Sequence, residues 1–179
     1  MDKIRVKDKE FELFISAEKI NETISRIADQ LNTDLKGKDP LFMVILNGAF
    51  MFAGDLIKKI TIDCEVSFVK LSSYSGTRST AVVKELIGLN EVLRGRTVVV
   101  IEDIIDTGVT MELMIGKLKE MDPSDVRIVT FLFKPEALTK DFTIDYVGIE
   151  IPNKFVVGYG LDYDGFGRNL PDIYKLATS

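Results

Sequence analysis

The sequence contains no histidine and only one cysteine among its 179 residues. Without histidine the chain cannot form a Ser-His-Asp triad, a zinc site built on imidazole or an imidazole base. Proton transfer must then fall to an aspartate, glutamate, lysine or tyrosine. The single cysteine, Cys64, cannot form an intramolecular disulfide, which suits a reducing compartment.

Long apolar segments are also missing. No run reaches the roughly 18 consecutive apolar residues of a membrane span, and the start of the chain, MDKIRVKDKE, lacks the apolar core of a signal peptide. We therefore expect a cytoplasmic protein that does not bind a membrane. The net charge of −5 and the pI of about 4.9 argue against a general nucleic-acid-binding surface.

The hydrophobic pattern predicts one domain, residues 1–179, with an α/β fold. Hydrophobic residues make up 46% of the chain, enough for a core. Strand-like segments alternate with helix-like ones, which is typical of a mainly parallel sheet flanked by helices. Helices are predicted at 16–36, within 47–60 and at 108–121, strands at 41–46, 64–71, 81–86, 97–101 and 126–133, and extended segments at 144–151 and 155–161.

Ligands of such sheets bind beyond the carboxyl ends of the strands. The loops that follow Leu46, Leu71, Ile101 and Phe133 are therefore expected to meet at one edge. The segment VVVIEDIIDTGVTM, residues 98–111, places acidic residues at this edge, directly after a strand that can be buried on both faces.

Two adjacent carboxylates, Glu102 and Asp103, end the apolar part of this segment. Buried without partners they would be very unfavourable, so they need hydroxyls, a metal or a cation. Vicinal sugar hydroxyls suit them, because an ionised carboxylate only accepts hydrogen bonds. The alternative is that both acids are simply solvated.

The next residues, DTGVT, enter a helix, where free N–H groups and the helix dipole favour an anion. Thr107 and Thr110 add hydroxyl donors, and Gly108 allows a close backbone approach. Carboxylates beside a phosphate site suggest a ribose 5-phosphate. In the alternative, Asp106 or Thr107 only caps the helix.

The whole segment resembles the phosphoribosyl pyrophosphate signature of the type I phosphoribosyltransferases, and residues 41–170 resemble the hypoxanthine-guanine members of that family. The resemblance implies a small hood formed by terminal segments, a homodimer or homotetramer, and Mg²⁺ as cofactor. It makes Asp106 the proton acceptor from the purine ring nitrogen. It assigns the ribose and its 5′-phosphate to Glu102, Asp103, Thr107, Gly108 and Thr110, and metal binding to Glu102, Asp103 and Asp162.

The resemblance also implies a pyrophosphate site at Asn47, Gly48 and Arg168. The family often has Lys or Arg where this chain has Asn47, so backbone N–H groups would serve there instead. The bond equivalent to Leu46–Asn47 is often a cis peptide in the family. Without the resemblance, LNGAF would be an ordinary strand-to-helix turn.

Two further segments match the family's lid and purine site. Ser73 and Tyr74 match the lid, which would exclude water from an oxocarbenium-like state; otherwise their loop is plain surface. Lys134 matches the lysine that binds the exocyclic oxygen of a 6-oxopurine. Without the resemblance, Lys134 would be interpreted as an exposed lysine at the end of a strand. Phe155 matches the aromatic residue that stacks on the base; without the resemblance it would be interpreted as a core residue. Val156 matches the residue whose backbone reads the base edge.

The predicted activity joins hypoxanthine or guanine to phosphoribosyl pyrophosphate, as in purine salvage, and gives IMP or GMP and pyrophosphate. One alternative is a transferase that prefers xanthine or uracil. Another is a regulator that keeps the fold, senses phosphoribosyl pyrophosphate and binds nucleic acid. The acidic balance of the chain argues against the regulator.

Overall fold

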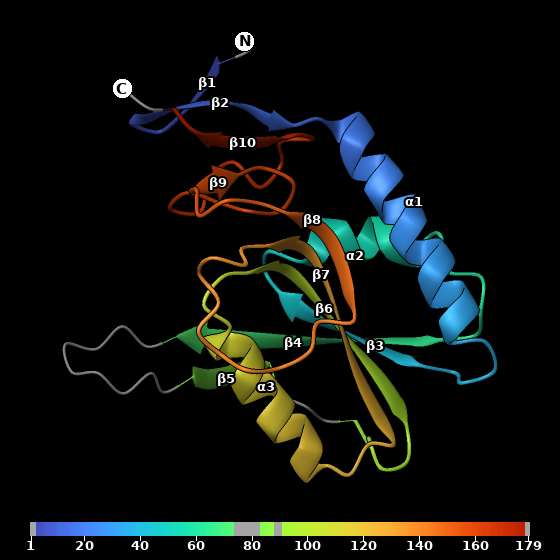
Figure 1. The fold of residues 1–179 in the computed structure, drawn as a ribbon. Helices are drawn as coiled ribbons and strands as arrows, with labels where there is room; N and C mark the ends of the chain where they lie inside the picture. The colour runs from blue at the N-terminus through green and yellow to red at the C-terminus, as the bar shows by residue number, and fades with distance from the viewer. Residues whose placement is uncertain (1–2, 74–82, 88–90, 178–179) are drawn as a thin grey trace.

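The part of the chain that the structure describes contains two β-sheets and three helices (Figure 1). The computed structural model of the chain describes residues 3–73, 83–87 and 91–177. Within these ranges, no helix is long and apolar enough to cross a membrane.

The main sheet has six strands in the order β5-β4-β3-β6-β7-β8. Strands β4, β3, β6, β7 and β8 run parallel, and β5 is antiparallel at one edge. The central strands contain long apolar runs, LFMVIL in β3 and VVVI in β6, as expected of parallel strands that are covered on both faces. The strands are β3 (Leu41–Leu46), β4 (Glu65–Ser73), β5 (Val83–Ile87), β6 (Thr97–Ile105), β7 (Asp125–Phe133) and β8 (Tyr146–Glu150).

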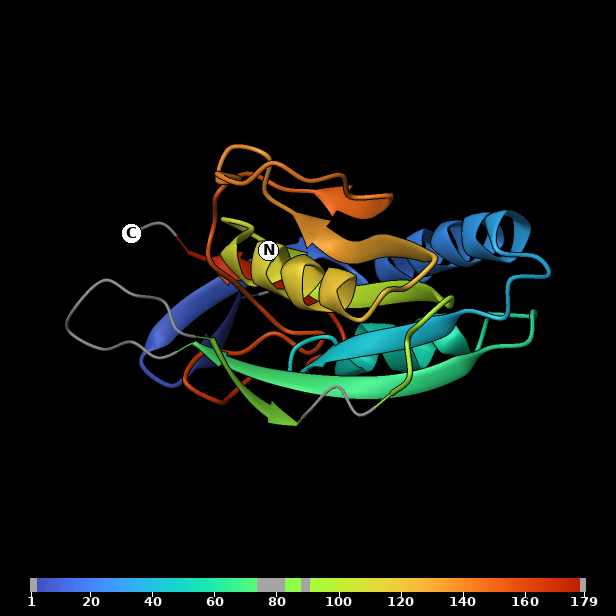
Figure 2. The same cartoon turned by 90° about the horizontal axis from the view of Figure 1, so that it is seen from below.

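Helices cover both faces of this sheet. Helix α3 (Val109–Glu120) lies nearest the viewer in Figure 2, with the sheet behind it and α1 (Ala17–Asp34) and α2 (Phe50–Ile57) beyond. The side chain of Ser16 accepts a hydrogen bond from the Lys19 amide and caps α1. Four apolar residues that recur on one face of α1 are buried in the core: Ile20, Ile24, Ile27 and Leu31.

A second, four-stranded sheet in the order β1-β2-β10-β9 forms a hood above the main sheet (Figure 1). All its pairings are antiparallel, and it brings both ends of the chain together. Its own small core contains Val6, Phe11, Val157 and Tyr174. The strands are β1 (Lys3–Val6), β2 (Lys9–Ile15), β9 (Val156–Val157) and β10 (Ile173–Leu176).

The predicted fold class is confirmed, with two corrections to its elements. The strand predicted at 97–101 continues to Ile105, because β7 pairs with it along its whole length, so Glu102 and Asp103 lie within β6. The extended segment predicted at 155–161 is a strand only at 156–157, because the backbone turns through positive φ from Gly158 to Gly160.

Candidate active site

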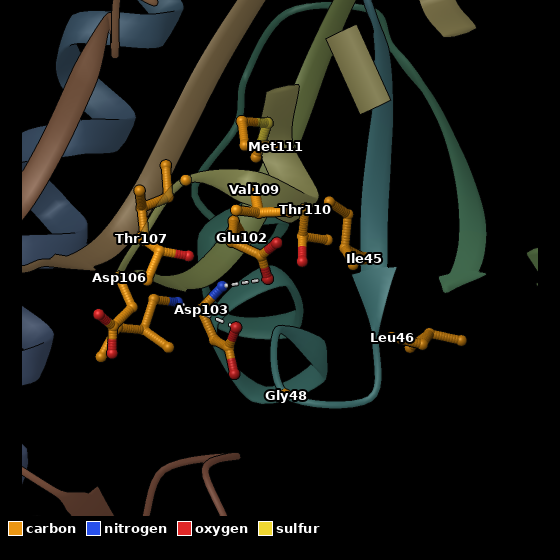
Figure 3. Close-up of a pocket in the computed structure, with 13 residues that line it drawn as sticks. Ile45, Leu46, Gly48, Glu102, Asp103, Asp106, Thr107, Val109, Thr110 and Met111 are labelled. Atoms are coloured by element: carbon orange, nitrogen blue, oxygen red, sulfur yellow. Dashed lines mark hydrogen bonds between the residues drawn. The ribbon is translucent and has the colours of Figure 1, made fainter. Parts of the chain in front are cut away.

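A pocket of about 260 Å³ opens where β3 and β6 end and α3 begins (Figure 3). Its position at the carboxyl edge of the parallel strands is the one predicted from the fold class. The pocket contains the acidic pair, the DTGVT segment and Gly48 of the loop after β3. Its lining residues are Ile45, Leu46, Gly48 and the continuous segment from Glu102 to Met111.

Both residues of the acidic pair line this pocket, with Glu102 buried and Asp103 half-buried. One Glu102 carboxylate oxygen accepts a hydrogen bond from the Asp103 amide at 3.2 Å, and one Asp103 oxygen accepts from the Ile104 amide at 2.9 Å. Burial, and then the negative charge of Asp103, raise the pKa of the Glu102 carboxyl well above its usual value. A cation or sugar hydroxyls at this point would stabilise the ionised form.

Gly48 lies directly against the carboxylate of Asp103 (Figure 3). A Cβ added to Gly48 would collide with Asp103 Oδ2. The peptide bond between Leu46 and Asn47 is cis, and the Asn47 side chain is exposed. The loop after β3 thus lies directly against Asp103 of the acidic pair.

We predict that Gly48→Ala weakens binding of phosphoribosyl pyrophosphate, the ligand that the sequence resemblance implies, by about tenfold or more, because displacing a group that contacts a charged ligand removes roughly 1.5–3 kcal/mol. Calorimetric titration would measure the affinity. The matched control is Gly54→Ala in α2, where no described atom lies within 4 Å of the added Cβ. That variant should keep its affinity and unfold at the same or a higher temperature. Equal affinity of Gly48→Ala and wild type would contradict the prediction.

The DTGVT segment forms a tight entry into α3. Gly108 is the N-cap with φ of +82°, and within the described residues no side chain donates or accepts a capping hydrogen bond there. The alternative in which Asp106 or Thr107 caps the helix is therefore wrong. The Thr107 side chain is exposed at the pocket. The backbone carbonyl of Thr107 accepts hydrogen bonds from the Thr139 amide and hydroxyl, each at 3.1 Å.

Lys134 reaches the same segment from the end of β7. Its side chain is only 7% exposed, so it is not the exposed strand-end lysine of the alternative interpretation. Its Nζ donates to Asp106 Oδ2 at 2.8 Å. The candidate proton acceptor and the candidate base-binding lysine are therefore in direct contact, a pairing that sequence spacing does not reveal.

Phe155 and Val156 belong to the hood. The ring of Phe155 is 46% exposed and lies 6.3 Å from the ring of Phe11 and 5.9 Å from that of Tyr163, centre to centre. Phe155 is thus a partly exposed aromatic residue that packs near two other rings, and not a core residue. Val156 is buried and pairs with Lys175 of β10.

Arg168 and Asp162 contact each other. The guanidinium of Arg168 lies 2.6 Å from Asp162 Oδ1 and donates to the Gly160 carbonyl at 2.7 Å. The α-carbon of Gly160 lies against the carbonyl oxygen of Gly48. Through Gly160, the loop that carries Arg168 is joined to the loop that follows β3.

The carboxylates suit a magnesium ion only in part. Across residues 3–73, 83–87 and 91–177, no three His, Cys, Asp or Glu side chains gather closely enough to hold a metal on their own. Mg²⁺ commonly keeps several waters and binds one or two carboxylates together with substrate phosphates. The pair Glu102 and Asp103 fits that pattern, whereas Asp162 is occupied by Arg168 and the Gly165 amide.

The predicted lid falls at the margin of the described chain. Ser73 is the last residue of β4, and Tyr74 lies outside the described residues.

The fold and the pocket define a class: an α/β protein whose pocket is built by a strand, a loop and a helix start at the carboxyl edge of a parallel sheet. A sequence model of the phosphoribosyl transferase domain matches residues 16–164. The hypoxanthine-guanine phosphoribosyltransferase of Lactococcus lactis is 41% identical over 166 residues, covering 92% of this chain and 90% of that protein.

A crystal structure of a hypoxanthine phosphoribosyltransferase from Staphylococcus aureus superposes with a TM-score of 0.88 at 38% identity, covering 93% of this chain and 91% of that one. The bifunctional TilS/HprT protein of Listeria monocytogenes is 41% identical over 162 residues, which cover 90% of this chain. This chain therefore matches only 25% of the length of that relative. The chain therefore belongs to the phosphoribosyltransferase family, and relatives such as the Lactococcus lactis protein are named hypoxanthine-guanine phosphoribosyltransferases. These matches confirm the predicted family.

Proposed function

We propose that the chain is a hypoxanthine-guanine phosphoribosyltransferase of purine salvage. It would transfer phosphoribose from phosphoribosyl pyrophosphate to a 6-oxopurine, giving IMP or GMP and pyrophosphate. The observation that carries the proposal is the Lys134–Asp106 pair at the rim of a pocket that contains an acidic pair and an anion-binding helix entry. The relatives named above support the same activity.

The pocket accounts for the sugar and its phosphate. Glu102 and Asp103 accept hydrogen bonds from the ribose hydroxyls, and the 5′-phosphate binds at Thr107, Gly108 and Thr110, where α3 begins. The pyrophosphate extends toward Gly48, the Asn47 backbone and Arg168. Magnesium, held at Glu102 and Asp103, would neutralise the charge of the leaving pyrophosphate.

The Lys134–Asp106 pair accounts for the purine. A 6-oxopurine presents an exocyclic oxygen next to a ring nitrogen that loses its proton as the glycosidic bond forms. Lys134 donates to the oxygen and Asp106 accepts the proton. In the ligand-free protein each group satisfies the other, so the buried lysine does not lack a partner before the base arrives. Phe155 stacks on the base from the hood side, and the Val156 backbone reads its edge.

We further propose the finer points that resemblance suggests. Residues 1–179 form a single phosphoribosyltransferase domain located in the cytoplasm. The chain assembles as a homodimer or homotetramer. Ser73 and Tyr74 belong to a lid, and Asp162 contacts magnesium through water after its pairing with Arg168 is broken.

Ultraviolet assays with magnesium, phosphoribosyl pyrophosphate and each of hypoxanthine, guanine, xanthine and uracil would test this function. Conversion of hypoxanthine and guanine is expected, and it should stop when EDTA removes the metal. Faster conversion of xanthine or uracil would favour the alternative transferases. Failure to convert any of the four bases, together with a gel shift of nucleic acid, would favour the regulator.

A further inference from the structure

A buried tyrosine joins the hood to the main sheet beside the candidate pyrophosphate site. Tyr159 lies in the loop after β9, with a side chain that is 5% exposed. Its ring lies 5.3 Å from that of Phe131 in β7. Its hydroxyl donates to Asp55 Oδ2 of α2 at 2.9 Å. Neither Tyr159 nor Asp55 lines the pocket or belongs to the proposed substrate contacts.

The backbone around Tyr159 is shaped to make this contact. Tyr159 has a φ of +49°, between Gly158 at +104° and Gly160 at +94°. A bulky residue seldom adopts positive φ, and a single such residue is unfavourable by about 1–3 kcal/mol. Amide hydrogen bonds hold the turn: Tyr159 donates to the Leu170 carbonyl and Gly160 to the Arg168 carbonyl, each at 2.9 Å.

The turn places two candidate pyrophosphate contacts next to each other. Arg168 donates to the Gly160 carbonyl, and the α-carbon of Gly160 lies against the Gly48 carbonyl. Gly48 itself leads into α2, the helix that carries Asp55: the Phe50 amide donates to the Asn47 carbonyl, and the Ala53 amide to the Ala49 carbonyl. Tyr159 is thus linked to both loops, through α2 on one side and through its own neighbour on the other.

We propose that Tyr159 is a positioning residue for the pyrophosphate half of the site. Its hydrogen bond to Asp55 fixes the hood loop on α2, so that Gly48 and Arg168 face the same anion. The inference rests on the proposed function, because it assumes that these two groups bind pyrophosphate. Tyr159 itself does not line the pocket.

The phenol is suited to a permanent donor role. Burial, followed by the hydrogen bond to Asp55, raises the pKa of Tyr159, so the hydroxyl stays protonated across the physiological range. The other Asp55 oxygen lies 2.7 Å from Lys58 Nζ. The carboxylate therefore has a partner on each oxygen, and one of the two ties it to the hood.

Steady-state kinetics in both directions, with Tyr159→Phe, would test the role. The expected result is a KM for phosphoribosyl pyrophosphate, and for pyrophosphate in the reverse reaction, about tenfold higher than in wild type, which is the scale of one hydrogen bond to a charged group. The KM for hypoxanthine should stay within about twofold, since Lys134 follows β7 and the ring of Phe155 packs near Phe11 and Tyr163, whereas the ring of Tyr159 packs near Phe131. Calorimetric titration of pyrophosphate should show the same loss without any turnover.

Tyr146→Phe is the matched control. Tyr146 is also 5% exposed and also donates to an aspartate, Asp34 at 3.0 Å, but it joins β8 to the end of α1, away from the pocket. A comparable fall in thermal stability with an unchanged KM for phosphoribosyl pyrophosphate is expected. An equal rise of that KM in both variants would show a general loss of stability and overturn the role.

Variants of Asp55 decide the matter if Tyr159→Phe does not fold. Asp55→Asn keeps an oxygen acceptor and should bind pyrophosphate like wild type, whereas Asp55→Ala should show the tenfold loss. Wild-type pyrophosphate affinity in folded Tyr159→Phe or Asp55→Ala would overturn the inference and leave the proposed function intact. A wild-type protein that neither binds pyrophosphate nor converts a 6-oxopurine would instead contradict the proposed function itself.

Discussion

Asp106→Asn is expected to lower kcat by about 10²- to 10⁴-fold, the usual contribution of a positioned general base. In the wild-type chain, Lys134 Nζ donates a hydrogen bond to Asp106 Oδ2 at 2.8 Å. An asparagine keeps the shape of the side chain, and its carbonyl oxygen can still accept that hydrogen bond. The pocket should therefore stay intact while the group that takes the purine proton is lost. The KM values for both substrates should change by less than the turnover does.

A matched control is Asp125→Asn. Asp125 begins β7, whereas Lys134, the partner of Asp106, follows the other end of that strand. Asp125 also pairs with a cation, Arg127 at 2.9 Å, but lies away from the pocket. Its kcat should equal that of wild type. Stopped assays with hypoxanthine would measure both variants, and wild-type turnover of Asp106→Asn would remove Asp106 from the mechanism.

Lys134→Ala is expected to raise the KM for hypoxanthine and guanine by about 10- to 100-fold, because a hydrogen bond to a charged group contributes roughly 1.5–3 kcal/mol. The change removes the donor for the exocyclic oxygen. It also leaves the Asp106 carboxylate without its cation at 2.8 Å, so turnover should fall as well. Phosphoribosyl pyrophosphate should still bind, because its proposed contacts lie on β6, at the entry into α3, on the loop after β3 and at Arg168.

Lys140→Ala serves as the comparison for Lys134. Lys140 forms an equally short ion pair, 2.7 Å from Glu112, outside the purine contacts. It should leave the KM for hypoxanthine unchanged. Fluorescence or calorimetric titration of the base, with kinetics for each substrate, would measure the effect. An unchanged affinity of Lys134→Ala for hypoxanthine would count against the assigned role.

The main sheet could be predicted from sequence because its strands are short apolar runs separated by helical patterns. The hood was expected only from resemblance. Its strands β1 and β2 read as a charged terminal stretch, KIRVKDKEFELFI, whose alternation is half polar. Strand β1 pairs with β2, and β2 pairs with β10, a partner more than 150 residues away in the sequence. Such distant pairing leaves no local signal.

The site was predictable to the level of residue type and segment. VVVIEDIIDTGVTM carries its chemistry within one strand, one loop and one helix start, so spacing alone placed it at the pocket. The pairs Lys134–Asp106 and Tyr159–Asp55 join segments 28 and 104 residues apart. The burial of Lys134 and the left-handed turn at Tyr159 are tertiary effects, although the GYG sequence does signal an unusual backbone there.

Strand β6 has different neighbours along its length. Val98 to Ile101 pair on both sides, with β3 and with β7, whereas the pairing with β7 alone continues to Ile105. In hydrogen exchange, amides of the first half should open only with the whole molecule, and those near Asp103 through smaller local openings. The acidic pair thus extends the half of β6 that we expect to exchange most slowly. The backbone at Glu102 and Asp103 can therefore adjust to a ligand while the first half of the strand stays anchored.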